Sequence, residues 1–448
     1  MPEEFQIINP YTNKALHTFS YESKESAQNK IKYLHQIFEH WRNESLIKRL
    51  TLVKNLADFI EKNREHIAQL ITTDMGKPFN QSIAEIKKCI ECCLFYSRQY
   101  NEINAKLNET WGMRCPIGVV LGIMPWNYPL WQIIRFIVPA LVVGNTCVIK
   151  PAPNTTRIAL ALIPFFEKKR IIDCMLTRNQ ITESLIEIDE IQGVSLTGSV
   201  KVGQHIGAIC GKHLKHCVLE LGGSDPFIIF NDANISTAIE TAVSARLLNS
   251  GQACISAKRF FFQDNIFDEC SKAFTEALRK KLSFGDPFDS STTIGPMARR
   301  DLKETLDDQL KRSNLTSSEI LFIYSHPLPS PNHFAPVIID GRKLPSKDPL
   351  LSEELFGPIC VLQSFSTVTD AIKKANNTQF GLGATIFTNN KKIKDQCINN
   401  IQTGAIAING LLKSQIDAPF GGVKQSGCGL ELGIEGCMSF TNVKTIIQ

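Results

Sequence analysis

One cysteine of the chain stands in a setting that suits chemistry better than packing. The stretch "LLNSGQACIS" covers residues 247–256 and surrounds Cys254 with small and polar residues. Buried cysteines usually behave as small hydrophobic side chains, which favours apolar runs. A thiol flanked by Gly251 and Ala253 leaves room for a substrate to approach, so Cys254 is the candidate nucleophile among the 14 cysteines.

Two other polar residues could support a nucleophile. Glu220 lies in the apolar run "CVLEL" (217–221), where burial would raise its pKa and suit it to general-base work. The alternative is a strand-end glutamate that faces solvent. Asn127 lies between two prolines in "PWNYP" (125–129), where its amide could donate to a developing oxyanion or cap the next helix.

Three further stretches could bind a nucleotide. Lys150 ends the run "CVIK" at the position where open α/β sheets bind ligands, although a solvated lysine is the alternative. Gly198 and Ser199 follow a strand pattern and precede a helical one, so backbone N–H groups there could hold a phosphate. This stretch is not Gly-x-Gly-x-x-Gly. One of Glu353 and Glu354 could hold a ribose, and a solvated acidic pair is the alternative.

Composition limits the class of protein. The 448 residues are 43% hydrophobic and 21% charged, with a net charge of +5 and no dense basic block, so we expect no nucleic-acid partner. Prolines and glycines interrupt the apolar zone 117–149, which argues against a membrane span. The acidic N-terminus does not resemble a secretory signal, so we expect a cytoplasmic protein with reduced thiols. Cys89, Cys92 and Cys93 fit helix packing better than a metal site, and we expect no metal.

The surrounding pattern indicates an α/β fold with two α/β domains. Helical periodicity covers 24–75 and stops at Met75-Gly76-Lys77-Pro78. From residue 117 onward, short apolar runs alternate with helical patterns, as expected for a mostly parallel sheet. The runs of the first series are 117–124, 145–150, 193–198 and 216–221. Those of the second are 226–230, 259–263, 360–365, 383–388 and 404–409. The Pro- and Ser-rich stretch 324–336 is predicted to be a surface loop.

Seven ordered motifs between residues 117 and 430 make the chain resemble the aldehyde dehydrogenase superfamily. They are Pro-Trp-Asn, Ile-Lys-Pro-Ala, Thr-Gly-Ser, Leu-Glu-Leu-Gly-Gly, Gly-Gln-x-Cys, Glu-Glu-x-Phe-Gly-Pro and Pro-Phe-Gly-Gly-x-Lys-x-Ser-Gly. The N-terminal "INPYTNKAL" extends the resemblance over nearly the whole chain. It implies a Rossmann-like NAD(P)-binding domain over 1–224, with part of an oligomerisation arm near 98–116. A catalytic domain over 225–417 follows, and 418–448 returns to the cofactor domain and ends in an oligomerisation strand.

The resemblance also implies residue roles. Cys254 matches the nucleophile, which forms a thiohemiacetal and then a thioester. Asn127 and the backbone N–H of Cys254 match the oxyanion hole, and Glu220 matches the base that activates water. The implied cofactor-binding residues are Trp126, Lys150, Pro153, Gly198, Ser199, Glu354 and Phe356.

Within the superfamily, the chain looks most like succinate-semialdehyde dehydrogenases. Arg135 matches an arginine that holds the substrate's distal carboxylate, and Ser414 matches a serine that helps it. Arg135 could instead pair with an acidic neighbour. Leu248 stands where some relatives have a second arginine, and Ser256 stands where some have a redox cysteine. The alternatives are another small aldehyde, such as glutarate semialdehyde, and a non-catalytic protein with the same fold.

Cofactor choice and assembly are further expectations. NAD-selective relatives often place a glutamate at the position of Pro153, so we expect NADP to be accepted, with NAD as the alternative. The segment 165–195 is short and lacks the family's usual Gly-x-Pro-x-Gly-Val turn beside the adenine pocket. The terminal "FTNVKTIIQ" resembles a strand that pairs across subunits, which implies a homodimer or homotetramer.

Overall fold

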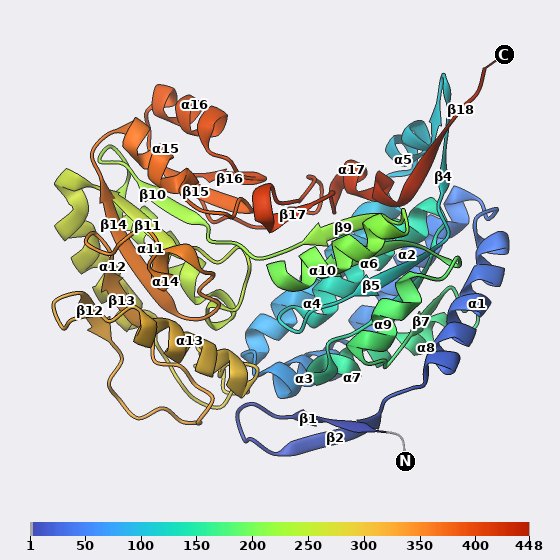
Figure 1. Cartoon of the computed structure of the whole chain (residues 1–448), viewed down its shortest axis with the longest axis horizontal. Helices are drawn as coiled ribbons and strands as arrows, with labels where there is room; N and C mark the ends of the chain where they lie inside the picture. Colours follow the sequence, from blue (N-terminus) through green and yellow to red (C-terminus); the bar gives the residue numbers. More distant parts are fainter. Residues whose placement is uncertain (1–2, 448) are drawn as a thin grey trace.

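A computed structural model describes residues 3–447, which form two lobes side by side, each built on its own sheet (Figure 1). The chain starts with the hairpin β1 (Glu4–Ile8) and β2 (Ala15–Ser20). Five helices follow: α1 (Lys24–Trp41), α2 (Leu46–Lys62), α3 (Arg64–Met75), α4 (Phe79–Ser97) and α5 (Tyr100–Leu107). The predicted stop is confirmed, because α3 ends at Met75 and Gly76 adopts φ 78°.

The six-stranded lobe contains the first predicted series of strands. Its sheet has the order β17-β9-β8-β5-β6-β7, and all its strands are parallel except the antiparallel edge strand β17. The bounds are β5 (Val119–Ile123), β6 (Thr146–Lys150), β7 (Ile172–Cys174), β8 (Ile191–Thr197), β9 (His216–Glu220) and β17 (Gly427–Cys428). The order of the parallel strands is that of a dinucleotide-binding half-sheet.

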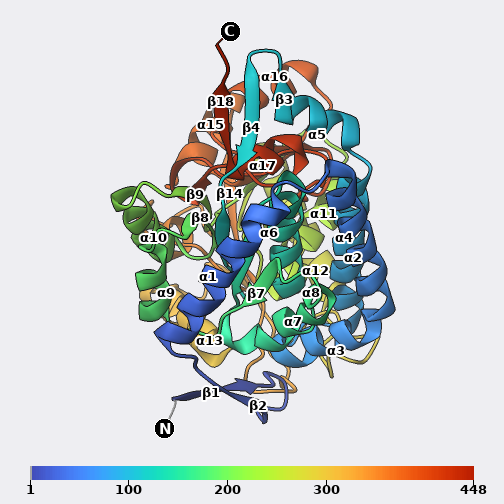
Figure 2. The same ribbon diagram turned by 90° about the vertical axis from the view of Figure 1, so that its right-hand side faces the viewer.

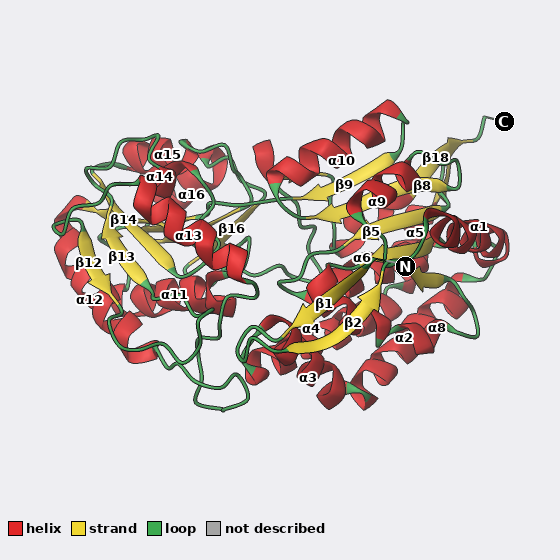
Figure 3. Cartoon of the chain, turned by 60° about the horizontal axis from the view of Figure 1, so that its bottom comes forward, coloured by secondary structure: helices red, strands yellow, loops and turns green. Residues whose placement is uncertain are grey.

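Helices cover both faces of this sheet (Figure 3). Side chains alternate along β5, so Val120 packs with α2, α4 and α6 (Pro129–Val143), whereas Val119 and Leu121 pack with α1 and α10. The bounds of the remaining helices are α7 (Thr156–Leu160), α8 (Ile163–Phe166), α9 (Asn179–Ile186), α10 (Val200–Lys212) and α17 (Gly433–Cys437).

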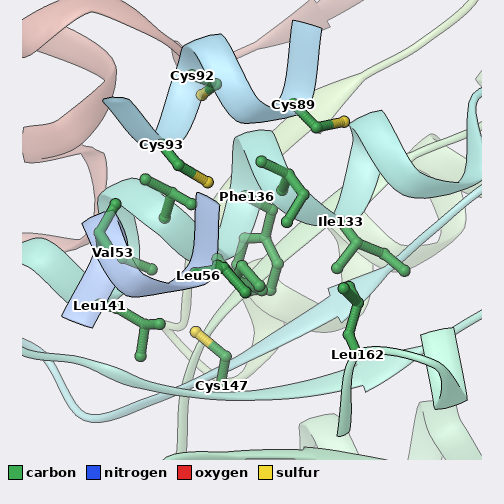
Figure 4. Close-up of a cluster of buried hydrophobic side chains, with 14 of the residues drawn as sticks. Val53, Leu56, Cys89, Cys92, Cys93, Ile133, Phe136, Leu141, Cys147 and Leu162 are labelled. Carbon is green, nitrogen blue, oxygen red and sulfur yellow. The ribbon is translucent and has the colours of Figure 1, made fainter. Parts of the chain in front are cut away.

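Three cysteines of α4 lie in the first of these cores. Cys89, Cys92 and Cys93 are 0% exposed and pack with apolar side chains from α2 and α6 (Figure 4). Their burial agrees with the interpretation as helix packing. Across residues 3–447, no three His, Cys, Asp or Glu side chains are grouped as metal ligands.

The seven-stranded lobe contains the second series. Its order is β12-β13-β14-β11-β10-β15-β16, and only β12 is antiparallel to its neighbour. The strands are β10 (Pro226–Ile229), β11 (Arg259–Gln263), β12 (Ile320–Ile323), β13 (Val337–Asp340), β14 (Ile359–Phe365), β15 (Gly383–Phe387) and β16 (Ala405–Ile408). The helices are α11 (Ile235–Leu247), α12 (Phe267–Lys281), α13 (Arg300–Arg312), α14 (Pro349–Ser352), α15 (Val368–Asn376) and α16 (Lys391–Asn400). The predicted α/β fold class is therefore confirmed.

The two sheets meet at opposite strand ends. The chain passes directly from the carboxyl end of β9 to the amino end of β10 through residues 221–225. The loops that follow β5, β6, β8 and β9 therefore face the loops that precede β11 and β14 (Figure 1). This junction is where an open α/β sheet offers a binding crevice.

A small arm projects from the six-stranded lobe (Figure 2). Strand β4 (Gly112–Pro116) pairs with β3 (Asn108–Glu109) on one side and with β18 (Thr441–Thr445) on the other. Residues 3–447 contain no helix that is both long and apolar enough for a membrane span.

The loop 324–336 differs from its prediction. It contains no helix or strand, but Ser330, Asn332 and His333 are buried, and the Asn332 amide donates to the Pro10 carbonyl at 2.7 Å. The loop is therefore partly covered rather than wholly at the surface, because the N-terminal hairpin packs over it.

Candidate active site

The loop that carries Cys254 follows a strained turn. Asn249, Ser250 and Gly251 all adopt left-handed conformations, with φ of 52°, 56° and 78°. Such a conformation is costly for the two residues that have side chains, so the surrounding structure must hold it. A Cβ on Gly251 would lie 2.6 Å from the backbone carbon of Gly357, so only glycine fits there.

A buried lysine fixes the next turn. The Lys258 ammonium donates to the carbonyls of Ala253, Cys254 and Ser256 at 3.1, 2.7 and 3.0 Å. A lysine has three N–H donors, and all three are used here. The backbone on both sides of the Cys254 thiol is therefore tied to one buried cation.

Asn127 joins this loop from the other lobe. Its Nδ2 donates to the Gln252 carbonyl at 3.0 Å, and the Asn249 amide donates to the Asn127 carbonyl at 2.9 Å. Asn127 does not cap α6 in the usual way, since that helix has no side-chain cap bond from its N-cap residue, Tyr128.

The start of α6 is held by α4 instead. Glu85 Oε1 accepts the backbone N–H groups of Leu130 and Trp131 at 2.9 and 3.0 Å. Its Oε2 pairs with the fully buried Lys77, which also lies 3.8 Å from the ring centre of Tyr128. A buried charge pair with further hydrogen bonds thus sets where Asn127 stands.

Glu220 is the last residue of β9 and is 2% exposed. Among residues 3–447, no side chain hydrogen-bonds to either of its carboxyl oxygens, and the Gly422 backbone N–H favours their charged form. Burial raises the pKa of Glu220 well above its usual range; the Arg135 charge opposes this shift, and the Glu431 charge adds to it. A buried carboxyl without a side-chain partner is poised to take a proton.

Charged side chains near Glu220 also shift the pKa of Cys254. Burial raises the pKa of its thiol to about 12; Arg135 and Lys258 lower it, and Glu220 and Glu354 raise it. The structure therefore brings Cys254, Glu220 and Asn127 to one place at the junction of the lobes.

Three of the predicted cofactor residues lie at neighbouring strand ends. Lys150 and Leu196 both pair with Ile123, and Thr197 pairs with Glu220, so Lys150, Gly198 and Ser199 follow one edge of the sheet. Lys150 donates to Asn179 Oδ1 at 3.0 Å, and burial lowers its pKa. Pro153 is exposed on the turn after β6.

A helix start lies at the same edge. Ser199 is the N-cap of α10 and accepts the Val202 N–H at 3.5 Å. The Gly198 N–H donates to the Glu220 carbonyl at 3.0 Å, and a Cβ on Gly198 would meet only Leu196, at 3.8 Å. The space beside Gly198 can therefore admit a phosphate close to the backbone.

The structure separates the two members of the acidic pair. Glu353 pairs with Arg312 at 2.7 Å, away from the junction. Glu354 Oε1 accepts the Gly223 N–H at 2.9 Å and lies 3.6 Å from Lys258, and a Cβ on Gly222 would lie 2.5 Å from Glu354 Oε2. The double glycine thus makes room for the Glu354 carboxylate.

Aromatic side chains complete this side of the junction. Trp126 and Phe356 meet edge to face, with ring centres 5.7 Å apart, and the Arg299 guanidinium lies 5.7 Å from the Trp126 ring centre. A cation at a strand end, a carboxylate for ribose hydroxyls and an open glycine form a donor set that fits a nicotinamide dinucleotide.

Arg135 and Ser414 have other partners. The Arg135 Nε lies 2.6 Å from Glu431 Oε2, and its Nη2 donates to Thr197 Oγ1 at 3.1 Å. Pairing with an acidic neighbour, the alternative left open by the sequence, is therefore what the structure contains. Ser414 accepts a hydrogen bond from the Lys88 ammonium at 2.6 Å.

The sequence prediction missed Glu431 and Lys88. Glu431 had a detectable signal, since Leu-Glu-Leu-Gly occurs at both 219–222 and 430–433 and places a carboxylate among leucines each time. Lys88 had none, because a lysine within a helical pattern is ordinarily solvated.

Comparison with known proteins agrees with this geometry. Residues 1–446 match the family described as the aldehyde dehydrogenase family. A probable NADP+-dependent succinate-semialdehyde dehydrogenase of Synechocystis is 35% identical over 98% of both chains. An Escherichia coli succinate semialdehyde dehydrogenase that uses NAD(P)+ is 34% identical over 98% of this chain and 96% of its own.

A solved structure gives the same result. The succinic semialdehyde dehydrogenase of Streptococcus pyogenes, in complex with NADP+, superposes with a TM-score of 0.93 at 31% identity and 99% coverage of both chains. Family, relatives and fold therefore agree, and the chain belongs to the aldehyde dehydrogenase family as an aldehyde-oxidising enzyme.

Proposed function

We propose that this enzyme oxidises succinate semialdehyde to succinate with NADP+ or NAD+. The observation that carries the proposal is that Cys254 lies near the Asn127 amide and the buried carboxyl of Glu220, which has no side-chain hydrogen bond. The substrate is supported by the similar proteins from Synechocystis, Escherichia coli and Streptococcus pyogenes, which are described as succinate-semialdehyde dehydrogenases.

In the first step, the Cys254 thiol adds to the aldehyde: its sulfur bonds to the carbon, and its proton goes to the oxygen of the thiohemiacetal and is released when the hydride leaves. One N–H of the Asn127 amide is engaged by the Gln252 carbonyl, so its second N–H and the backbone N–H of Cys254 are the donors for the developing oxyanion. The bound dinucleotide supplies the acceptor for the hydride that leaves the substrate carbon. The acyl group then remains on Cys254 as a thioester.

In the second step, Glu220 takes a proton from a water molecule that attacks the thioester carbon. The C–S bond breaks, succinate leaves and the thiol regains its proton. Burial raises the pKa of Glu220, so its carboxylate is a stronger base than a solvated one.

NADP+ is the cofactor that we expect to be accepted. Pro153 is exposed on the turn after Lys150 and brings no negative charge to repel a 2′-phosphate. The Synechocystis relative is described as NADP+-dependent, and the Streptococcus pyogenes enzyme was solved with NADP+. Measuring kcat/KM with both cofactors tests this, and a strong preference for NAD+ would contradict it.

We also propose a cytoplasmic homodimer or homotetramer. All 14 cysteines are free, as in a reducing compartment. The arm formed by β3, β4 and β18 carries exposed apolar side chains, which are suited to contact with a second copy.

The deciding experiment follows NADPH or NADH formation with a panel of aldehydes. We expect succinate semialdehyde to give the highest kcat/KM and Cys254→Ala to abolish turnover. A higher value with glutarate semialdehyde would favour that substrate instead. No reduced cofactor with any aldehyde would indicate a non-catalytic member of the family.

A further inference from the structure

The Arg135 guanidinium is already neutralised. Its Nε lies 2.6 Å from Glu431 Oε2, its Nη2 donates to Thr197, and the side chains of Arg135 and Glu431 are only 3% and 6% exposed. A substrate carboxylate could bind the Nε side of Arg135 only by displacing Glu431. Leaving Glu431 buried without its partner would be costly.

Lys88 has no such partner. Among the described residues, no carboxylate lies within ion-pair distance of its half-buried ammonium. The ammonium donates to Ser414 Oγ at 2.6 Å and lies 4.2 Å from the ring centre of Trp131. Two of its three N–H groups are still free to bind an anion. A partly buried cation without a counterion favours the binding of a negatively charged group.

The surroundings connect Lys88 to the loop that carries Asn127. Glu85, one turn earlier on α4, holds the start of α6 directly after Asn127. Trp131 lies on that first turn of α6 and packs in the same core cluster as Cys254. Arg135, one turn after Trp131 on α6, donates to Thr197, which pairs with Glu220 across β8 and β9.

We propose that Lys88, together with the Ser414 hydroxyl, binds the carboxylate at the far end of an ω-carboxylated aldehyde, whereas the Nε side of Arg135 holds Glu431. Ser414 accepts a hydrogen bond from Lys88 and can donate its own proton to the carboxylate. The assignment rests on the proposed function and names the residue that confers its substrate class.

The test compares a carboxylated and an uncharged aldehyde of equal chain length. The variants are Lys88→Met, Lys88→Arg and, as a matched control, Lys87→Met, which changes the adjacent exposed lysine. The readout is the ratio of kcat/KM for succinate semialdehyde to that for butanal. Thermal unfolding of each variant checks that it is folded.

For Lys88→Met we expect this ratio to fall about 10- to 100-fold, mainly through a higher KM for succinate semialdehyde, because a charge-assisted hydrogen bond is lost. Lys88→Arg should retain more of the ratio, and Lys87→Met should leave it unchanged. The kcat/KM for glutarate semialdehyde should fall by a similar factor, since its carboxylate carries the same charge.

The outcomes separate the two proposals. An unchanged ratio in Lys88→Met, with wild-type enzyme that prefers succinate semialdehyde, would overturn the role of Lys88 and leave the proposed function standing. The role of Lys88 would also be overturned if Arg135→Gln lowered the ratio selectively and Lys88→Met did not. A wild-type enzyme that prefers butanal would overturn both, and one that oxidises no aldehyde would overturn the proposed function first.

Discussion

Burial raises the pKa of both side chains that we propose to react, Cys254 and Glu220. It raises the pKa of the half-buried Cys254 thiol to about 12 and that of Glu220 well above its usual range, because the charged form of each group loses water. Before substrate and cofactor bind, the thiol is therefore neutral at pH 7. The site therefore holds a weakly acidic thiol beside a carboxyl of raised pKa.

This property predicts how the free enzyme reacts with alkylating agents. The thiolate is the reactive form, so the alkylation rate of Cys254 should rise about tenfold for each pH unit between 7 and 10, without a plateau. Mass spectrometry of the peptide that contains Cys254, after timed iodoacetamide pulses, measures this rate. A plateau near pH 8 would mean that the thiol is far more acidic than its burial implies.

Replacing the base should stop the second half of the reaction but not the first. Glu220→Gln keeps the shape of the side chain but cannot take a proton, so thioester hydrolysis should slow by about 10²- to 10⁴-fold. Stopped-flow absorbance should then record a burst of about one reduced cofactor per active site, followed by slow turnover. Glu353→Gln, whose side chain pairs with Arg312 outside the site, is the control. Absence of this burst in Glu220→Gln would show that Glu220 is also needed before the thioester forms.

At the scale of elements, α4 positions the site although it carries none of the reacting atoms. Glu85 and Lys88 are three residues apart and share one helix face. Glu85 fixes the start of α6, and Lys88 contacts Ser414 on the loop after β16. One helix thus sets both the position of Asn127 and the proposed end of the substrate chamber.

Removing the Glu85 carboxylate from α4 should lower the free energy of unfolding. Glu85→Ala leaves Lys77 buried without its partner and exposes two backbone donors of α6, so we expect a loss of about 3–5 kcal/mol in the free energy of unfolding. Denaturant titration measures this loss. Glu91→Ala, at an exposed position of the same helix, should cost less than about 0.5 kcal/mol. If both variants lost only a small and equal amount of unfolding free energy, the ion pair between Glu85 and Lys77 would not stabilise the fold.

The sequence pattern predicted those strands and helix ends that depend on residues close together in the chain. The run 259–263 coincides with β11, and Gly76 ends α3 because glycine adopts a left-handed φ at no steric cost. The hairpin of β1 and β2 was missed, as was the three-residue β7, which is too short to show periodicity. The pairing of Arg135 with Glu431 could not be predicted, because either charge could have been solvated and only the fold brings them together.

At the scale of the whole molecule, the site is a product of two lobes. The seven-stranded lobe supplies Cys254, Lys258 and Glu354 from loops before its strands. The six-stranded lobe supplies Glu220, Asn127 and Lys150 from the ends of its strands. The hydrogen bonds between Asn127 and the Cys254 loop join these halves, so their relative position is part of the catalytic geometry.

The arm should control assembly. Trp111, Met113 and Val443 are 44%, 38% and 49% exposed on it, which is unfavourable for a surface that remains in water. Trp111→Ser combined with Val443→Lys should therefore shift the protein to a smaller species in analytical ultracentrifugation. Val202→Lys, an equally exposed position on the body of the lobe, is the control. An unchanged mass in the arm variant would locate the subunit contact elsewhere.

The ion pair between Arg135 and Glu431 also bears on how the protein matures as it leaves the ribosome. The six-stranded sheet begins with the first half of the chain, but β17 and Glu431 are synthesised only after the whole seven-stranded sheet. Until then the Arg135 charge lacks its partner, Glu220 has no neighbour strand on its outer side, and the core of this lobe stays open. The first lobe to begin folding is therefore the last to be completed, and a truncated nascent chain that already contains Cys254, Glu220 and Asn127 should still be inactive.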